Sequence, residues 1–157
     1  MDSIPAKKEL NLRLFMYHTP LGPNKNQTTI VQSNAANSFG TVAINDWPCY
    51  DGLGNDAKLI ARAQGMHLQA GVQQGRWYNS LNLEFEDPKY KKDSSLQVMG
   101  TVVESGEWSI LGGTGEFTLA EGVIYKRFVE QRSDGNIMEL NIRAFYTTLP
   151  DHKWSSN

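Results

Sequence analysis

The sequence predicts an all-β fold in which antiparallel strands close into a barrel or pair as a sandwich. Apolar and polar side chains alternate along most of the 157 residues, which is the period of a strand with two different faces. Short groups of glycine, proline, asparagine and aspartate separate these segments, and such residues favour tight turns. Exposed sheet edges promote aggregation, so about eight strands of this kind are expected to close on themselves.

The first expected strand covers residues 10–17 and places Leu10, Leu12, Leu14 and Met16 on one face. The further expected strands cover residues 28–32, 39–45, 59–69, 78–85, 96–103, 117–131 and 137–147. The turn at 133–136 joins two alternating runs and predicts a β-hairpin. A barrel of about eight strands has room in its mouth for one small ligand.

Composition and charge exclude several classes of function. The net charge is −2 and no basic stripe is present, which argues against a nucleic-acid partner. No run reaches the roughly 18 apolar residues that a membrane-spanning helix needs, and the first ten residues lack the apolar core of a signal peptide. Cys49 is the single cysteine and has no internal disulfide partner. A cytoplasmic protein is expected, because that compartment keeps thiols reduced.

Residues 111–128, LGGTGEFTLAEGVIYKRF, raise the question of a phosphate-binding loop. Such a loop needs free backbone amides, a following helix and usually a lysine. Here Glu116 follows the glycines and would repel phosphate, and the residues after it favour a strand. We therefore expect Gly112, Gly113 and Gly115 to form a strand corner, where a positive φ is tolerated.

Candidates for metal binding and nucleophilic catalysis are weak. His18, His67 and His152 are far apart and none has a cysteine or carboxylate at ligand spacing, so no metal or other cofactor is expected. Cys49 follows Trp47 and Pro48 and is interpreted as a small buried hydrophobic residue rather than a nucleophile.

Two features leave alternatives open. Glu116 and Glu121 lie five residues apart, so a regular strand directs them to opposite faces and only a bulge brings them together. Aromatic side chains at turns and strand ends either stack on a sugar or a phenolic ligand or simply cap the barrel. These aromatic residues are Trp47, Trp77, Tyr78, Trp108 and Trp154.

Several motifs, in order and correctly spaced, resemble the plant dirigent proteins. They are GGTGEFTLAEGV at 112–123, ARAQGMH at 61–67, FGTVAINDWPCYDG at 39–52 and the first strand with its following loop. The resemblance spans residues 10–147. It implies an eight-stranded antiparallel barrel of the allene-oxide-cyclase-like type, commonly trimeric, with a pocket at one end.

Classical dirigent proteins guide the stereoselective coupling of phenoxy radicals that a separate oxidase produces. The present sequence departs from their pattern at two positions. Classical members are also secreted and stabilised by a disulfide, and neither feature is expected here. Thr19 stands where lignan-forming members carry aspartate, and Glu121 replaces the arginine of an alanine-arginine-glycine element. Both changes would alter acid chemistry on a phenolic substrate.

A grass branch of the family, in which a dirigent domain precedes a mannose-binding jacalin lectin, resembles this sequence more closely. It is linked to plant defence and stress and has no signal peptide. The resemblance implies a flexible leader at 1–8, a dirigent domain at 9–148, and the start of a linker to a jacalin domain at 149–157.

From these elements we expect a non-catalytic, homotrimeric domain that binds a carbohydrate at the barrel mouth. Trp47 is the expected stacking residue, and the expected polar lining is Tyr17, Thr19, Asp46, Glu116, Glu121 and Tyr125. One alternative is dirigent activity or related phenolic chemistry, with Glu116 or Asp46 as general acid and Tyr17 orienting the phenol. The other alternative is a purely structural role, in which trimerisation raises the avidity of an attached lectin.

Overall fold

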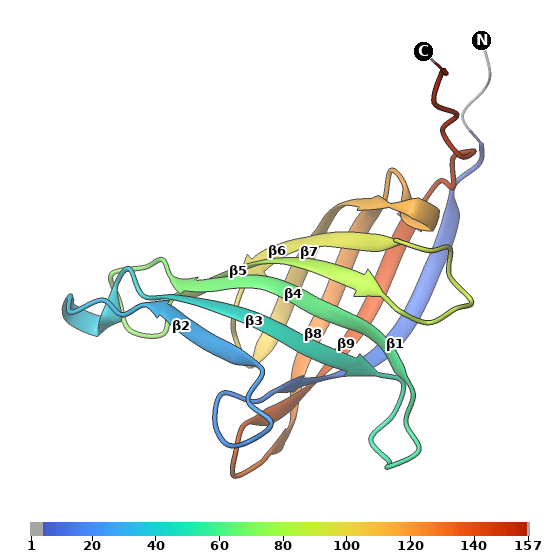
Figure 1. The fold of residues 1–157 in the computed structure, drawn as a ribbon. Helices are drawn as coiled ribbons and strands as arrows, with labels where there is room; N and C mark the ends of the chain where they lie inside the picture. Colours follow the sequence, from blue (N-terminus) through green and yellow to red (C-terminus); the bar gives the residue numbers. More distant parts are fainter. Residues whose placement is uncertain (1–4, 157) are drawn as a thin grey trace.

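The computed structural model describes residues 5–156 and contains nine β-strands and two short 3₁₀ turns (Figure 1). The strands are β1 (Lys8–His18), β2 (Gln27–Val31), β3 (Val42–Tyr50), β4 (Leu59–Gln69), β5 (Trp77–Phe85), β6 (Ser95–Thr101), β7 (Ser105–Thr114), β8 (Glu121–Gln131) and β9 (Asn136–Tyr146). The 3₁₀ turns are η1 (Ala36–Ser38) and η2 (Gly115–Phe117).

Eight of these strands form a closed antiparallel ring. Strands β3 to β9 follow one another as a meander, and β1 pairs with β9 from Lys8 opposite Tyr146 to His18 opposite Asn136. The ring closes where Phe15 and Met16 of β1 meet Tyr50 and Cys49 of β3. The predicted eight-stranded antiparallel barrel is therefore confirmed.

The eight strands that form the ring are not the same eight strands that the sequence predicted. Strand β2, predicted within 28–32, pairs only with β3 and lies outside the ring. Strand β7 takes its place in the ring and was not predicted, because half of its residues are serine or glycine. The strand expected to start at residue 117 begins at Glu121, because η2 occupies the preceding turn.

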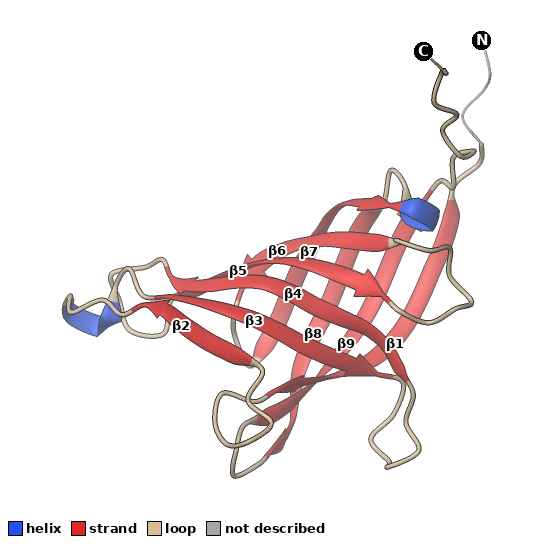
Figure 2. Cartoon of the chain, in the orientation of Figure 1, coloured by secondary structure: helices blue, strands red, loops and turns tan. Residues whose placement is uncertain are grey.

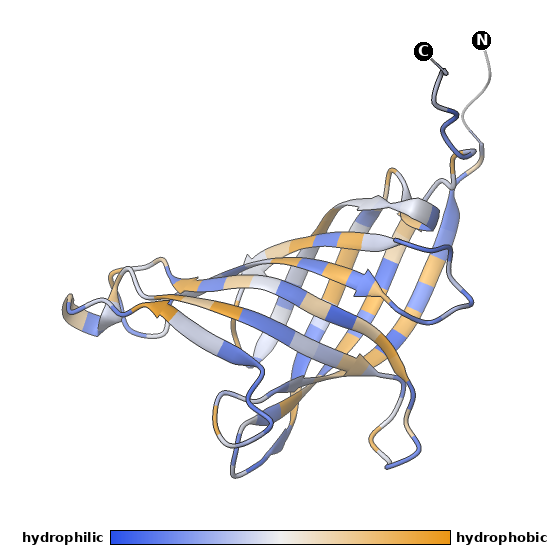
Figure 3. Cartoon of the chain, viewed as in Figure 1, coloured by the Kyte–Doolittle hydropathy of each residue, from blue (hydrophilic) through white to orange (hydrophobic). Residues whose placement is uncertain are grey.

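The alternating pattern packs a continuous core inside the barrel. Hydrophobic and hydrophilic residues alternate along the strands in Figure 3. On β1 the predicted inward residues Leu14 and Met16 are almost fully buried and belong to the core cluster. Each buried residue of this kind stabilises the fold by about 1.5–3 kcal/mol.

The glycine run forms the predicted strand corner between β7 and β8. Gly115 has a φ of +62°, a conformation that side chains with a Cβ rarely adopt. A Cβ on Gly113 would lie 2.1 Å from the carbonyl oxygen of Phe117, so only glycine fits there. Figure 2 shows that η2 lies at the end of the barrel near the two chain termini.

The proposed leader and linker flank this barrel. Residues 1–4 of the leader lie outside the described part of the chain, and β1 already begins at Lys8. After β9, residues 147–156 contain no helix or strand. Among residues 5–156, no helix is long and apolar enough to cross a membrane.

Candidate functional site

A cavity of about 350 Å³ opens at the end of the barrel opposite η2. In an antiparallel barrel, the end of one strand lies beside the start of its neighbour. The cavity walls therefore come from the last residues of β1, β4 and β8 and from the first residues of β3, β5, β7 and β9. The volume lies in the range of sites for small organic ligands.

Three tryptophans form the aromatic wall of the cavity. Trp47 donates from Nε1 to Oε1 of Gln27 at 3.0 Å, and Trp108 donates from Nε1 to the carbonyl oxygen of Thr101 at 2.9 Å. Trp77 completes the wall. These hydrogen bonds satisfy two indole N–H groups and hold both almost fully buried rings in the cavity wall.

His67 is held between two of these indoles in a defined tautomer. Its ring centroid lies 5.1 Å from that of Trp47 and 5.6 Å from that of Trp77. The Asn45 amide donates to the carbonyl oxygen of Ala63, so its Oδ1 accepts a proton from Nδ1 of His67 at 3.0 Å. Nε2 is then the unprotonated nitrogen and a hydrogen-bond acceptor.

Burial keeps both cavity histidines neutral near pH 7. Desolvation lowers the pKa of His67 to about 4, and the nearby His18 contributes to the same shift. Desolvation also lowers the pKa of His18 below its ordinary value. The two rings therefore offer neutral nitrogen atoms to a ligand rather than positive charge.

Lys126 is the buried basic group of the cavity and is only 5% exposed. Its Nζ lies 4.9 Å from the ring centroid of Trp108, which is a cation–π distance. Among the described residues no carboxylate lies within 4 Å of it, and the exposed Glu104 at the mouth acts only through space. Desolvation lowers the pKa of the amine to about 8.

Two asparagines near this end have unused polar atoms. Oδ1 of Asn136, which lines the cavity, has no hydrogen-bond partner in the described structure. Asn79 lies opposite His67 in the register of β4 and β5 and leaves both amide atoms unpaired. A cavity that combines tryptophan, methionine and valine side chains with histidine, lysine and amide groups suits an aromatic ligand that carries hydroxyl or carbonyl groups.

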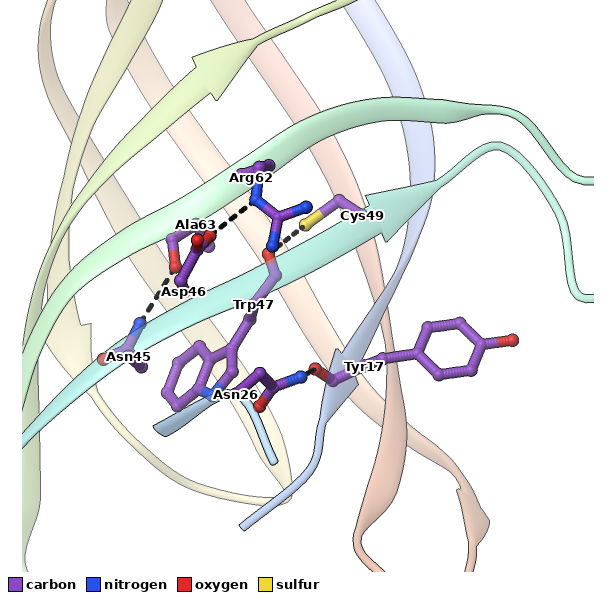
Figure 4. Close-up of polar contacts among 8 residues, drawn as sticks. All are labelled: Tyr17, Asn26, Asn45, Asp46, Trp47, Cys49, Arg62 and Ala63. Atoms are coloured by element: carbon purple, nitrogen blue, oxygen red, sulfur yellow. Dashed lines mark hydrogen bonds and ion pairs between the residues drawn. The ribbon is translucent and has the colours of Figure 1, made fainter. Parts of the chain in front are cut away.

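The structure does not bring the seven predicted site residues together. Trp47 lines the cavity, but its neighbour Asp46 points to the outside and pairs with Arg62 at 2.7 Å (Figure 4). Tyr17 points away from Trp47, and with Thr19 it lines a separate polar groove on the outer surface. Successive residues of a strand face opposite sides, so a one-residue difference decides which of them enters the barrel.

The three remaining predicted residues also lie away from the cavity. Glu121 is exposed and pairs with Lys7, and Tyr125 is exposed on the outer face of β8. Glu116 belongs to η2, at the opposite end of the barrel. The two positions that depart from the lignan-forming pattern, Thr19 and Glu121, therefore do not line the cavity.

Sequence reasoning missed His18, His67 and Lys126 as cavity residues. The signal for Lys126 was its two-residue spacing from the apolar Ile124, which put it on the inward face of β8. Cys49 is fully buried, and desolvation raises the pKa of its thiol to about 12, which suits the predicted structural role. No group of three potential metal ligands occurs within residues 5–156.

Comparisons with known proteins agree with this architecture. The model of the family described as dirigent-like protein matches residues 9–145. Pterocarpan synthase 1 of Glycyrrhiza echinata is 26% identical over 89% of this chain and 79% of its own length. Dirigent protein 23 of Arabidopsis thaliana is 28% identical over 81% of this chain and 71% of its own length.

A solved structure of a pterocarpan synthase dirigent protein superposes with a TM-score of 0.82 at 25% identity, covering 97% of this chain and 92% of the other. A second such structure gives a TM-score of 0.73 at 22% identity, covering 93% and 99%, which supports the fold. The family match and the barrel lead to one conclusion: the chain belongs to the dirigent-like protein family.

Proposed function

We propose that the barrel cavity binds an aromatic phenolic compound and directs its reaction, the dirigent type of function. The observation that carries this proposal is the wall of three tryptophans in a cavity that also presents His67 and Lys126 to a ligand. Indole faces stack on flat aromatic rings. Two relatives named for forming pterocarpans, which are aromatic phenolic compounds, support the same class of ligand.

In this proposal the protein orients its ligand and the reactive species comes from outside. A separate one-electron oxidant converts each phenol into a phenoxy radical, and two radicals then share their unpaired electrons in one new bond. Nε2 of the neutral His67 accepts a hydrogen bond from a phenolic hydroxyl, and the walls fix which face of the ring is open.

Carbohydrate binding at the mouth is the weaker alternative. A sugar needs several donors and acceptors for its hydroxyl groups, whereas much of this cavity is indole, methionine, valine and phenylalanine. The expected acidic lining faces elsewhere. A jacalin domain beyond residue 157 and a homotrimeric assembly stay predictions, and the comparisons support the family rather than this branch of it.

The test couples product chirality to ligand binding. Coniferyl alcohol is oxidised by an external one-electron oxidant with and without the protein, and the dimers are separated by chiral chromatography. We expect an enantiomeric excess that Trp77→Ala abolishes and Tyr78→Ala leaves intact, because these neighbours on β5 face opposite sides.

Binding is measured in parallel from tryptophan fluorescence, with a set of phenols, a pterocarpan and a set of monosaccharides. We expect saturable quenching by phenolic ligands and none by sugars. A racemic product together with no quenching by any phenolic compound would overturn the proposal. Saturable quenching by sugars alone would restore the carbohydrate hypothesis.

A further inference from the structure

The surroundings of the Lys126 amine differ from those of the lysines that form ion pairs. Lys7, Lys58 and Lys91 form surface ion pairs with carboxylates. Lys126 instead points into the cavity from β8, packs over Trp108 and has no carboxylate within 4 Å in the described chain. A buried amine without a counter-ion favours its neutral form.

The neutral amine is the nucleophilic form. Burial lowers the pKa of Lys126 to about 8 from its ordinary value of 10.5. At pH 8 roughly half of this side chain is unprotonated, against less than about 1% of a lysine with an ordinary pKa. The titratable groups that act on it are Glu104, which raises its pKa, and His18 near the same cavity.

We propose that Lys126 captures aromatic aldehydes inside the cavity as a reversible imine. Its Nζ attacks the carbonyl carbon and forms a C–N bond, giving a carbinolamine after proton transfer. Loss of one water molecule then gives the C=N bond of the imine, and hydrolysis returns both reactants. The step needs no oxidant or reductant, and solvent at the open mouth carries the protons and the water.

The cavity walls select the aldehyde. The side chains of Trp47, Trp77 and Trp108 line the cavity that holds Nζ, which itself lies over the ring of Trp108. A flat aromatic aldehyde therefore stacks before it reacts, which raises its local concentration at the amine. An aliphatic aldehyde lacks this stacking, so its preference for Lys126 rests on the unprotonated amine alone and is smaller.

The experiment traps the imine on the whole chain. The protein is mixed with vanillin at pH 8 and treated with sodium borohydride, which reduces C=N to a stable secondary amine. Intact mass and peptide mapping then locate the label. We expect vanillin to label Lys126 at least about tenfold faster than any exposed lysine, and propanal to show a smaller preference for Lys126 than vanillin does.

Two variants and one control complete the test. Lys126→Arg keeps the charge but forms no imine under these conditions, and Lys126→Met removes both charge and amine; both are expected to lose the fast label. Lys92→Met, at an exposed lysine, is expected to retain it. Far-UV circular dichroism checks that each variant is folded. If Lys126→Met is unfolded, Lys126→Arg alone tests the loss of the fast label.

The outcomes separate this inference from the proposed function, with which it shares the cavity. Even labelling of all lysines, or equal labelling of Lys126→Arg and the wild type, would overturn imine capture. If tryptophan quenching by phenols persists in that case, the proposed function stands. If quenching is also absent, both proposals fail.

Discussion

The two ends of the barrel are both rich in aromatic rings, but the rings have different partners. At the η2 end, Phe85, Tyr90, Phe117 and Tyr146 form an aromatic plug whose ring centroids lie 4.7–5.4 Å apart. At the opposite end, the tryptophans line a cavity. Trp47 and Trp77 pack on His67 rather than on one another, and Trp47 and Trp108 also donate hydrogen bonds from their indole N–H groups.

This difference indicates how one barrel combines stability with an open site. Rings that pack on each other fill space and exclude solvent, which stabilises the closed end. Rings anchored by hydrogen bonds stay against the wall and leave volume for a ligand. The aromatic plug is thus expected to dominate unfolding, and the cavity to dominate binding.

The largest expected effect tests the aromatic plug. Phe117 is fully buried, so Phe117→Ala is expected to lower the free energy of unfolding by about 3–5 kcal/mol. Trp77→Ala, at the partly open cavity, is expected to cost clearly less while it abolishes binding. Urea denaturation measures the free energy of unfolding of both variants. Equal losses would contradict the idea that the aromatic plug contributes more to stability than the cavity end does.

The second effect is the pH dependence that His67 adds at the cavity end. The unfolded chain binds a proton at a pKa near 6.5 and the folded chain at about 4, so unfolding takes up a proton between these values. The contribution of His67 to the free energy of unfolding is therefore fully present above pH 6.5, and it falls by up to about 3 kcal/mol as the pH drops to 4.

Urea denaturation at pH 7 and pH 4.5 checks this sign, with His67→Gln as the control. The variant is expected to lose less stability on acidification than the wild type does. An equal loss in both proteins would assign the acid sensitivity to other groups.

A smaller effect tests whether the hydrogen bond to Gln27 holds the indole ring of Trp47 in place. Trp47→Phe removes the donor to Gln27 and is expected to cost about 1 kcal/mol of stability. Gln27→Leu removes the acceptor, and the double variant gives the coupling between the two side chains. Additive losses would show that this bond does not hold Trp47 in place.

The smallest effect concerns the outer face. The Asp46–Arg62 pair is partly exposed, so Asp46→Asn is expected to cost less than about 1 kcal/mol. Phenolic quenching of tryptophan fluorescence should not change, because Asp46 lies outside the cavity. A marked loss of binding would mean that the outer face takes part in ligand recognition.

Local pattern was sufficient for most strands but not for all. The predicted strand at 59–69 matches β4 because its alternation and flanking turns agree. Strand β7 carries few β-branched or aromatic residues, and its conformation comes from pairing with β6 and β8 on both sides. Such tertiary support outweighs local preference and is invisible in a single sequence.

The site was harder to predict than the fold, because it depends on which face of each strand turns inward. Asp46 and Trp47 are neighbours of comparable interest in the sequence, yet only Trp47 enters the cavity. Lys126 looks like a surface residue by charge alone. The local sign of its burial is its two-residue spacing from Ile124, which places it on the inward face of β8.

The closure of the ring has a consequence for how the protein is made. Strand β1 is paired along its whole length with β9, the last strand, and touches β3 through two residue pairs. Strands β3 to β9 can form as successive hairpins while the chain leaves the ribosome. Strand β1 has no full-length partner until β9 is synthesised, so its apolar face stays uncovered during translation of the strands between them. Aggregation is expected mainly during this period.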